Sequence, residues 1–581
     1  MSMSLIAELR RRNVIRMAGL YLVGAWLLTQ VSSTVLPTFD VPSWALRALI
    51  IVLALGFVPA LVFAWMFELT PHGLKRESGP PTLSNAPASL AGLLPNQIDA
   101  TVTTGTTGNA NTQLKGASRI DSIAVLPFHM RNSDADTEYL SNGLVESLIY
   151  RLSHLSSLNV CPTSSIQRYR AATTDPLQAG RDLGVSAVMT GRFTQRGDAL
   201  VVSVELLDVA NQRLLWGERY DRKLADLLAT QREIAAEIVQ NLKPELSAPD
   251  RASLDKQYTS SNAAYQLYLK GKHHYSKRTL DSIERGIDCF RQAIALDPQF
   301  ALAYVGLADS YISMPAFSYR SSHETYPLAI AAVRRALEID FSLGEAHAAL
   351  AISVASHDWN WVEAEREFKV ALELAPRAAD THFRYGMTFL GPMGRTREAV
   401  AELEQAVELE PLTLIIGTNL TLGYIYARQY ARALDQARKT HALDPGFMVG
   451  RVALGFAYNA NAMYNEAIAL IETEPKDSPA YRWFLVFAGY AYAKSNRPAE
   501  ARAAVAQYAE LAKAHYVSNY YLAIMYAALD DREAAFAALE QACVERDFFV
   551  ARLNVDPFLD DLRDDPRLAE LARRIGVIRA P

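Results

Sequence analysis

The chain has 581 residues and a formal net charge of −5, with 21% charged and 50% hydrophobic residues. This length gives room for about three or four domains, and the slight negative charge offers no basic surface for nucleic acid, so no nucleic-acid partner is expected. The three cysteines, Cys161, Cys289 and Cys543, form no CxxC pair. Their number and spacing argue against a disulfide framework or a zinc site and favour free thiols in a reducing compartment.

Two uncharged apolar runs near the N-terminus predict a transmembrane hairpin. Residues 17–36 and 48–67 each supply about the 20 residues that a helix needs to cross a ~30 Å hydrocarbon core. A pair of buried core helices is the alternative. Basic residues precede the first run and follow the second, whereas the turn LPTFDVPSW between them has none. Because loops rich in Lys and Arg stay inside, we expect residues 1–76 to span the lipid bilayer of the bacterial inner membrane as a multi-pass anchor, with both termini cytoplasmic.

A linker and a small α/β domain are expected next. Residues 77–118 are rich in Gly, Pro, Ser, Thr and Asn and nearly uncharged, which is typical of a flexible linker. Residues 119–246 change character, with strand-like runs, an amphipathic helix that repeats leucine at every fourth position, and a Gly197-Asp198 hairpin turn. A helix at about 227–242 closes the unit.

The residues of this domain show no catalytic pattern. Asp134, Asp136 and Glu138 resemble the start of a calcium loop, but the Gly at the sixth position and the Glu at the twelfth are missing. No Walker phosphate loop, HExxH or GxSxG occurs in the chain, and the pair His273-His274 has no second ligand motif beside it. We therefore expect no catalytic residues, no bound metal and no cofactor.

A family resemblance becomes specific over the α/β domain. It is carried, in this order, by SIAVLPF, EYLSNGLVESLI, GRDLGVSAVMTGRF, VELLDV and LLWGERYDRKLADLLATQREIA. These stretches resemble the TolB-like, FlgO-related domain of bacterial signalling proteins, which often carry a tetratricopeptide array and a nucleotide cyclase or an OmpR-type winged helix. The family usually has an acidic residue where this chain has Asn142, in a phrase like FSDGL, and this departure weakens the idea that the turn binds a ligand. The N-terminal runs also resemble the membrane hairpin of such proteins.

From residue 261 the sequence repeats. The segments that close successive repeats end at Pro376, Pro411 and Pro445, and spacings of about 34 residues are typical of tetratricopeptide (TPR) repeats. We expect an all-α TPR superhelical solenoid of about eight helical pairs at 261–546, followed by a charged, solubilising cap at 547–581.

The consensus register predicts a groove on the concave side of the array. Apolar and aromatic side chains there suit an amphipathic helix or an extended segment of a protein partner, although several could instead be ordinary core. The predicted groove positions are Phe383, Met387, Leu420, Tyr424, Val452, Phe456, Val486 and Tyr490.

The sequence therefore predicts a multidomain, membrane-anchored and non-enzymatic scaffold or regulatory protein that recruits protein partners. The alternative is a non-catalytic partner or degenerate relative of membrane nucleotide cyclases or of transcription regulators. The catalytic module of the cyclases has no counterpart in the sequence, and only about sixteen residues, too few for a winged helix, precede the first apolar run. The sequence does not specify the oligomeric state.

Overall fold

The computed structural model describes most of the chain beyond residue 119. The described residues are 29, 67–70, 73–76, 120–130, 135–153, 155, 158–170, 175–242, 254, 256–478 and 480–577. The chain divides into two units, 1–112 and 113–581, which are described separately.

The first unit contains one small antiparallel sheet among its described residues. Strand β1 (Phe67–Thr70) pairs with β2 (Gly73–Arg76), and Phe67 lies opposite Arg76. The linker 77–118 and nearly all of the two predicted spans lie outside the described residues, Thr29 and Phe67 excepted.

The predicted membrane location is corrected by the structure. A helix needs about 20 apolar residues to cross the hydrocarbon core. In the part of the chain that the structure describes, no helix combines the necessary length with the necessary apolar character. This finding overturns the predicted placement in the bacterial inner membrane with both termini cytoplasmic, and it gives no support to a bilayer contact through two helices.

The second unit begins with the α/β region, as predicted. Its strands, in chain order, are β3 (Ser122–Val125), β4 (His129–Met130), β5 (Asn159–Val160), β6 (Ala187–Arg196), β7 (Ala199–Asp208) and β8 (Arg213–Lys223). The sheet order is β5-β3-β6-β7-β8, with β4 beside β6. The pairs that involve β3, β4 and β5 are parallel, and β6, β7 and β8 form an antiparallel meander.

Hydrophobic periodicity explains these elements. In β7 buried and more exposed residues alternate along the strand, as expected for a sheet with one covered face, and Gly197 turns the β6–β7 hairpin with a positive φ of 58°. The helices are α4 (Ala135–Ser153), α5 (Thr163–Ile166), α6 (Pro176–Leu183) and α7 (Leu227–Leu242). The leucines that repeat at every fourth position of α4 are fully or almost fully buried; they are Leu140, Leu144, Leu148 and Leu152.

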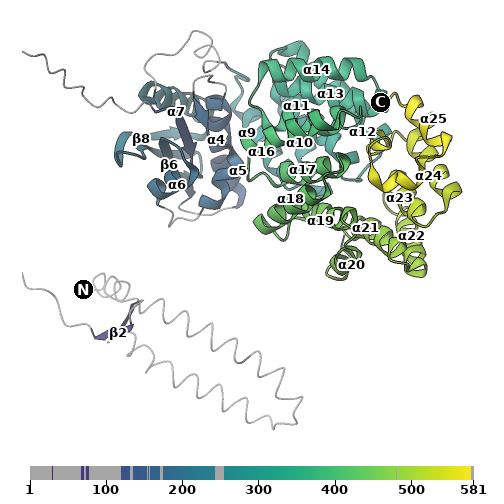
Figure 1. Ribbon diagram of the computed structural model, residues 1–581. Helices are drawn as coiled ribbons and strands as arrows, with labels where there is room; N and C mark the ends of the chain where they lie inside the picture. The colour runs from purple at the N-terminus through teal and green to yellow at the C-terminus, as the bar shows by residue number, and fades with distance from the viewer. Residues whose placement is uncertain are drawn as a thin grey trace, which may run out of the picture. The chain divides into compact units, whose positions relative to one another are not determined.

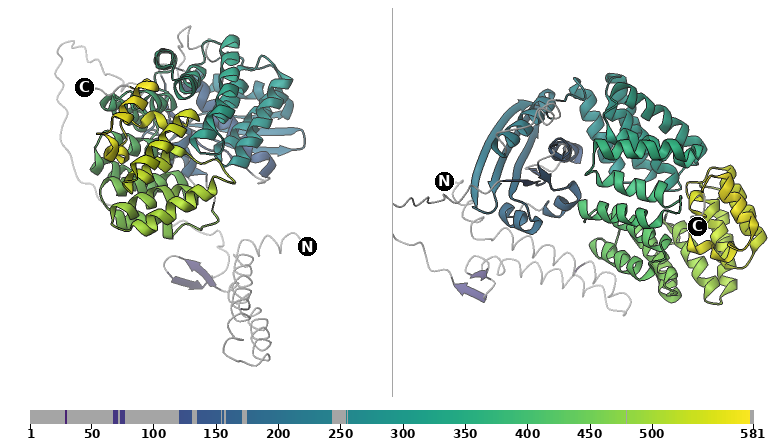
Figure 2. Two further views of the ribbon diagram at one scale, coloured as in Figure 1. Left: turned by 90° about the vertical axis from the view of Figure 1, so that its right-hand side faces the viewer. Right: turned by 45° about the horizontal axis from the view of Figure 1, so that its top comes forward.

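The rest of the unit is a solenoid of antiparallel helical pairs, which confirms the predicted helical architecture (Figures 1 and 2). The first four described pairs are α9 (Asn262–Ser276) with α10 (Leu280–Leu296), α11 (Ala301–Ala316) with α12 (Ser322–Ile339), α13 (Gly344–Ser353) with α14 (Trp361–Leu374), and α15 (Ala379–Tyr385) with α16 (Thr396–Leu409). The next four are α17 (Leu414–Tyr426) with α18 (Tyr430–Leu443), α19 (Met448–Ala460) with α20 (Tyr464–Glu472), α21 (Tyr481–Lys494) with α22 (Pro498–Leu511), and α23 (Asn519–Ala528) with α24 (Arg532–Val544).

Close packing in the array depends on small residues at helix crossings. A Cβ at Gly455 of α19 would lie 2.7 Å from the ring of Phe487 in α21, and one at Gly423 of α17 would lie 2.4 Å from the side chain of Leu403 in α16. A side chain at either glycine would therefore separate the helices, because protein cores are packed nearly as densely as crystals.

A partly buried polar junction joins the α/β region to the array. The Tyr150 hydroxyl of α4 donates to Glu345 of α13 at 2.7 Å. The neighbouring Arg151 donates to the carbonyl of Lys256 at 3.0 Å, and the Lys256 ammonium lies 2.6 Å from Asp340. Because these bonds connect residues far apart in the sequence, they fix α4 against the first half of the array.

Candidate functional site: a cavity on the concave side of the array

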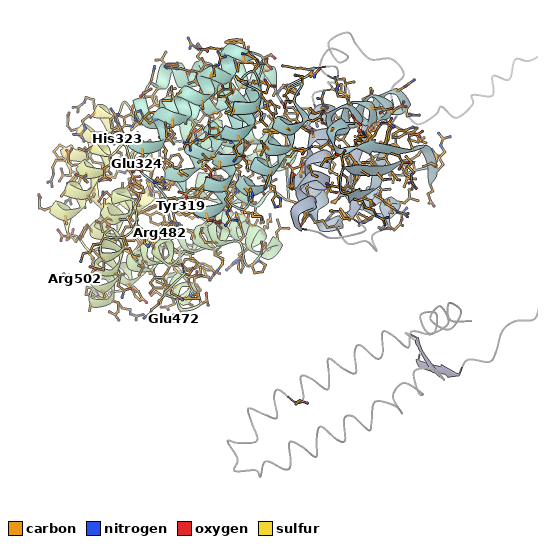
Figure 3. The ribbon with its side chains drawn as sticks, turned by 180° about the vertical axis from the view of Figure 1, so that it is seen from behind. Tyr319, His323, Glu324, Glu472, Arg482 and Arg502 are labelled. Atoms are coloured by element: carbon orange, nitrogen blue, oxygen red, sulfur yellow. The ribbon has the colours of Figure 1, made fainter. Side chains whose placement is uncertain are left out.

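The array curves far enough for its last helices to touch its early ones. The Arg482 guanidinium of α21 donates to the carbonyl of Phe317 at 3.1 Å and lies 5.5 Å from the ring centre of Tyr319, in the segment after α11 (Figure 3). The Trp361 indole of α14 donates to the carbonyl of Ile575 at 2.7 Å. The concave side is therefore bounded by both ends of the solenoid.

The C-terminal segment, defined here as residues 547–562, crosses this concave side. It contains two short 3₁₀ helices, η6 (Val550–Arg552) and η7 (Pro557–Leu562), and is followed by α25 (Pro566–Arg574). Four of its aliphatic side chains are fully buried: Val550, Leu553, Leu559 and Leu562. The sequence predicts a solubilising cap from residue 547, but the first part of that cap packs inside the array.

Aromatic contacts seat the C-terminal segment. The ring of Phe558 lies 5.4 Å from that of Phe456 and 4.9 Å from that of Tyr490. The ring of Phe549 lies 5.9 Å from that of Trp483. These distances are in the range for favourable aromatic pairs, so the segment fills the place where the sequence predicts a partner.

Two buried carboxylates shape the same segment. Asp547 accepts a hydrogen bond from the Ser518 hydroxyl at 2.7 Å, and Asp556 accepts from the Tyr520 hydroxyl at 2.8 Å and from the backbone N–H of Phe558 at 3.0 Å. Burial raises the pKa of both carboxyl groups above the ordinary value, and these hydrogen bonds offset only part of the effect.

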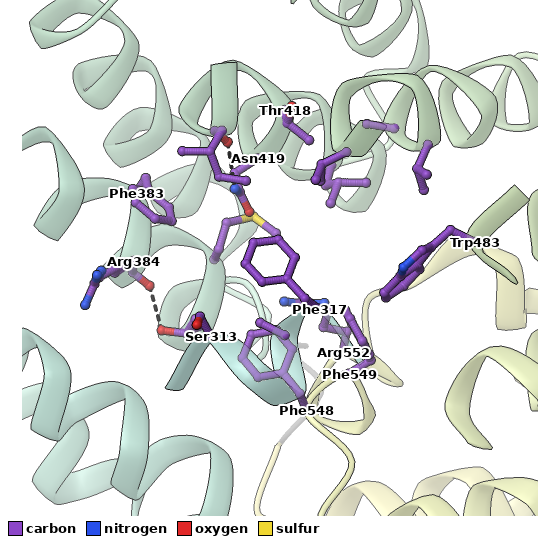
Figure 4. A pocket seen from close by; sticks show the side chains of 18 of the residues that line it. Ser313, Phe317, Phe383, Arg384, Thr418, Asn419, Trp483, Phe548, Phe549 and Arg552 are labelled. Carbon is purple, nitrogen blue, oxygen red and sulfur yellow. Dashed lines mark hydrogen bonds between the residues drawn. The ribbon is translucent and has the colours of Figure 1, made fainter. Parts of the chain in front are cut away.

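A cavity of about 240 Å³ remains between the helices and the C-terminal segment (Figure 4). Its lining is mostly apolar and comes from the first helices of all eight pairs (α9, α11, α13, α15, α17, α19, α21 and α23), from the helical turn 386–390 after α15, and from the C-terminal segment. An apolar cavity with a few polar groups is the usual form of a small-molecule site.

One end of the cavity holds an ion-pair cluster. Arg384 of α15 lies 2.7 Å from Asp309 of α11 and 2.5 Å from Asp380. Burial alone lowers the pKa of Arg384, but the two carboxylates outweigh it and hold the pKa above its ordinary value. Arg384 is therefore already paired with two acids.

A second arginine in the lining is not paired in this way. The Arg552 side chain is buried, with 5% exposure, and its guanidinium lies 4.9 Å and 5.0 Å from the ring centres of Phe548 and Phe549. The Tyr426 hydroxyl is its hydrogen-bond partner. Within the described part of the chain, no carboxylate oxygen lies within 4.0 Å of this guanidinium. The sequence-based groove did not include Arg552, because the repeat register does not extend beyond α24.

The eight predicted groove residues fall into two sets. Four of them line the cavity: Phe383, Met387, Val452 and Phe456. The other four lie elsewhere and are Leu420, Tyr424, Val486 and Tyr490, of which the first three are buried. The Tyr424 hydroxyl donates to Glu404 of α16 at 2.7 Å, so this side chain connects helices of neighbouring pairs. A role in partner binding stays a prediction for the whole set.

The metal and cofactor expectations also stay predictions. No group of three or more His, Cys, Asp or Glu side chains suited to a metal gathers among the described residues. The rings of His273 and His274 lie 5.9 Å apart, and burial lowers the pKa of both. Neither observation bears on catalysis.

The chain is similar to several bacterial proteins over part of its length. A family described as the second domain of HilA/YgeH-like transcriptional regulators matches residues 118–237. A Rhizobium meliloti protein named putative adenylate cyclase 3 is 28% identical over 237 residues, which are 40% of this chain and 40% of that protein. The transcriptional regulator HilA of Salmonella typhimurium is 24% identical over 332 residues, 55% of this chain and 57% of HilA. The chain thus spans about half the length of these relatives, and the TolB-like assignment of the α/β region stays a prediction.

Solved structures with similar folds include helical-repeat proteins. A thermophilic TPR protein of Thermus thermophilus is 20% identical, with a TM-score of 0.30, over 34% of this chain and 100% of that chain. PilF of Pseudomonas aeruginosa is 22% identical, with a TM-score of 0.29, over 37% of this chain and 92% of that chain.

Proposed function

We propose that the chain is a non-enzymatic regulatory protein that recruits protein partners through its helical array. The observation that carries the proposal is a row of aliphatic side chains along one edge of the solenoid. In five successive pairs the last residue of the second helix is aliphatic and at least partly exposed; these residues, which we call the aliphatic edge, are Leu296, Ile339, Leu374, Leu409 and Leu443.

The exposure of this edge distinguishes it from the concave side. Leu296, Leu374 and Leu443 are 54%, 40% and 51% exposed, whereas the C-terminal segment covers much of the concave side and leaves only a cavity there. Because the helical pairs repeat with a period of about 34 residues, the edge offers apolar positions at regular intervals along the solenoid. Such spacing suits the apolar stripe of an amphipathic helix on a protein partner.

The test uses the full chain. We expect Leu296→Gln, Leu374→Gln and Leu443→Gln, introduced together, to reduce crosslinked partner recovery about tenfold or more, as loss of an interface anchor does. The melting temperature should stay close to that of the wild type, since exposed positions contribute little to stability. The matched control replaces Val362, which is 84% exposed and lies at the start of α14, by Gln. Unchanged recovery by the triple variant, or ATP or GTP turnover by the purified chain, would contradict the proposal.

A second candidate is a non-catalytic partner of a nucleotide cyclase or of a transcription regulator. It is favoured by the names of the two curated relatives. In this case the chain should alter the cyclic nucleotide level or the transcription of target genes only when a second protein is present. A change that the purified chain produces alone would exclude this candidate.

A further inference from the structure

We propose that the cavity binds a small apolar molecule that carries a carboxylate, with the carboxylate paired to Arg552. The proposal concerns the inside of the array and does not rest on the aliphatic edge.

Because the C-terminal segment occupies the concave side, the remaining space suits a small ligand better than a peptide. To admit a peptide, the C-terminal segment would have to leave, exposing Val550, Leu553 and Leu559, each fully buried. On the outside, Arg428 binds Asp560 through two nitrogen atoms at 2.6 and 2.8 Å, which also holds the segment in place. Exposing several fully buried aliphatic side chains is costly, so the occupant of the cavity must fit beside the segment.

The volume limits the size of this occupant. A cavity of about 150 Å³ holds benzene, so by proportion about 240 Å³ holds a molecule of about ten non-hydrogen atoms. The side chains around the space include Ile312, Met448 and Val449. They match an aliphatic or aromatic body without polar groups.

The charges around the cavity favour a carboxylate head. Its acidic lining residues are Asp309, Asp380 and Asp556. Arg384 forms ion pairs with the first two. Asp556 accepts hydrogen bonds from a tyrosine hydroxyl and a backbone N–H, and the positive charges of Arg563 and Arg552 act on it without an ion pair within 4.0 Å.

Two basic lining residues therefore remain without an ion pair among the described residues. Arg278 is partly exposed, and its guanidinium lies 5.8 Å from the ring centre of Phe317. Arg552 is buried, and Figure 4 shows it among Phe317, Phe548 and Phe549. A buried guanidinium binds a carboxylate strongly, because both groups are charged and water is excluded.

The experiment compares octanoate with 1-octanol by calorimetry on the full chain. Both probes have an eight-carbon body, and octanoate has ten non-hydrogen atoms. We expect octanoate to bind about tenfold or more tightly than octanol, since a charge-assisted bond replaces a neutral one. Arg552→Met should remove this preference and leave octanol binding unchanged, whereas Arg502→Met, at an exposed position of α22 outside the cavity, should preserve it. Equal binding of the two probes to the wild type, no binding of either, or a preference that survives Arg552→Met would overturn the proposal.

A second measurement does not depend on the folding of a variant. Wild-type chain is irradiated with an octanoate analogue that carries a diazirine on its last carbons, and the labelled residues are mapped by mass spectrometry. Labels on lining residues such as Met448 and Phe317, lost when octanoate is added in excess, are the expected result. Labels confined to the surface would overturn the proposal.

Discussion

Two regions of the protein join segments that are distant in the sequence, and they do so by different chemistry. At the junction between the α/β region and the array, polar side chains bind one another directly, as Tyr150 binds Glu345 and Lys256 binds Asp340. On the concave side the contacts are mainly aromatic and aliphatic, a cavity remains, and within the described residues Arg552 has no carboxylate oxygen within 4.0 Å, although its charge acts on Asp556. Direct polar bonds hold the elements of the junction together, although the Nε atom of Arg151 there is buried without a hydrogen-bond partner. On the concave side the buried charge of Arg552 borders an apolar cavity, which is the usual form of a small-molecule site.

The largest effect is expected from the packing of the concave side. Leu559→Ala removes a fully buried side chain and should lower the free energy of unfolding by about 2–5 kcal/mol through lost burial and a residual cavity. Leu443→Ala, at a position that is 51% exposed, is the matched control and should change it by about 0.5 kcal/mol or less. Chemical denaturation of both variants measures the difference. Similar values would mean that the C-terminal segment contributes little to the fold.

A smaller loss of stability is expected from a substitution at the polar end of the cavity. Arg384→Met leaves Asp309 and Asp380 without their shared cation. Since Arg384 is 12% and Asp309 19% exposed, water offsets part of the loss, and we expect a decrease of about 1–3 kcal/mol. Replacing Asp309 by Asn at the same time should recover part of the loss, because one of the unpaired charges is then gone. A single variant as stable as the wild type would show that the cluster does not hold α11 to α15.

Removing a single hydrogen bond at the junction between the α/β region and the array should lower the stability less. Tyr150→Phe keeps the ring and removes the donor to Glu345, so the free energy of unfolding should fall by about 1 kcal/mol. In a double-mutant cycle with Glu345→Gln, a coupling energy near zero would argue against a direct bond between the two side chains.

The smallest effect is the pH dependence that comes from Asp556. Burial raises the pKa of its carboxyl group, so the folded protein takes up this proton at a pH at which the unfolded chain, with a pKa of about 3.9, does not. The contribution of the group to stability is therefore most favourable below about pH 4 and declines as pH rises through the raised pKa. The stability of the wild type relative to Asp556→Asn should fall between pH 4 and pH 7 in denaturation series. A difference that rises with pH would mean that the pKa is lowered instead.

Sequence reasoning found the elements because they follow local rules. Each pattern has the period of one kind of structure. Buried and exposed residues alternate in β7 as in a strand, the leucines of α4 repeat as on a helix, and the period of roughly 34 residues is that of a helical repeat. The closure of the concave side follows no such rule. It depends on the accumulated curvature of the solenoid, which brings Arg482 to Phe317 across 165 positions.

The candidate site was predictable only in part for the same reason. The register gave Phe383, Met387, Val452 and Phe456 as concave, and these line the cavity. It could not show that Tyr424 reaches Glu404 of the preceding pair, or that Arg552 enters from outside the repeats. Side chains supplied by a non-repeating segment have no signature in a repeat.

Hydrogen exchange of the C-terminal segment in the full chain tests most directly whether the array is closed from within. If the segment is part of the array's core, the backbone amides of Leu553, Leu559 and Leu562 should exchange about as slowly as those of the buried helix α23, because all would open only with the array. If these three amides exchange as fast as those of exposed loops while α23 stays protected, the account is contradicted, and the concave side is an open groove in solution.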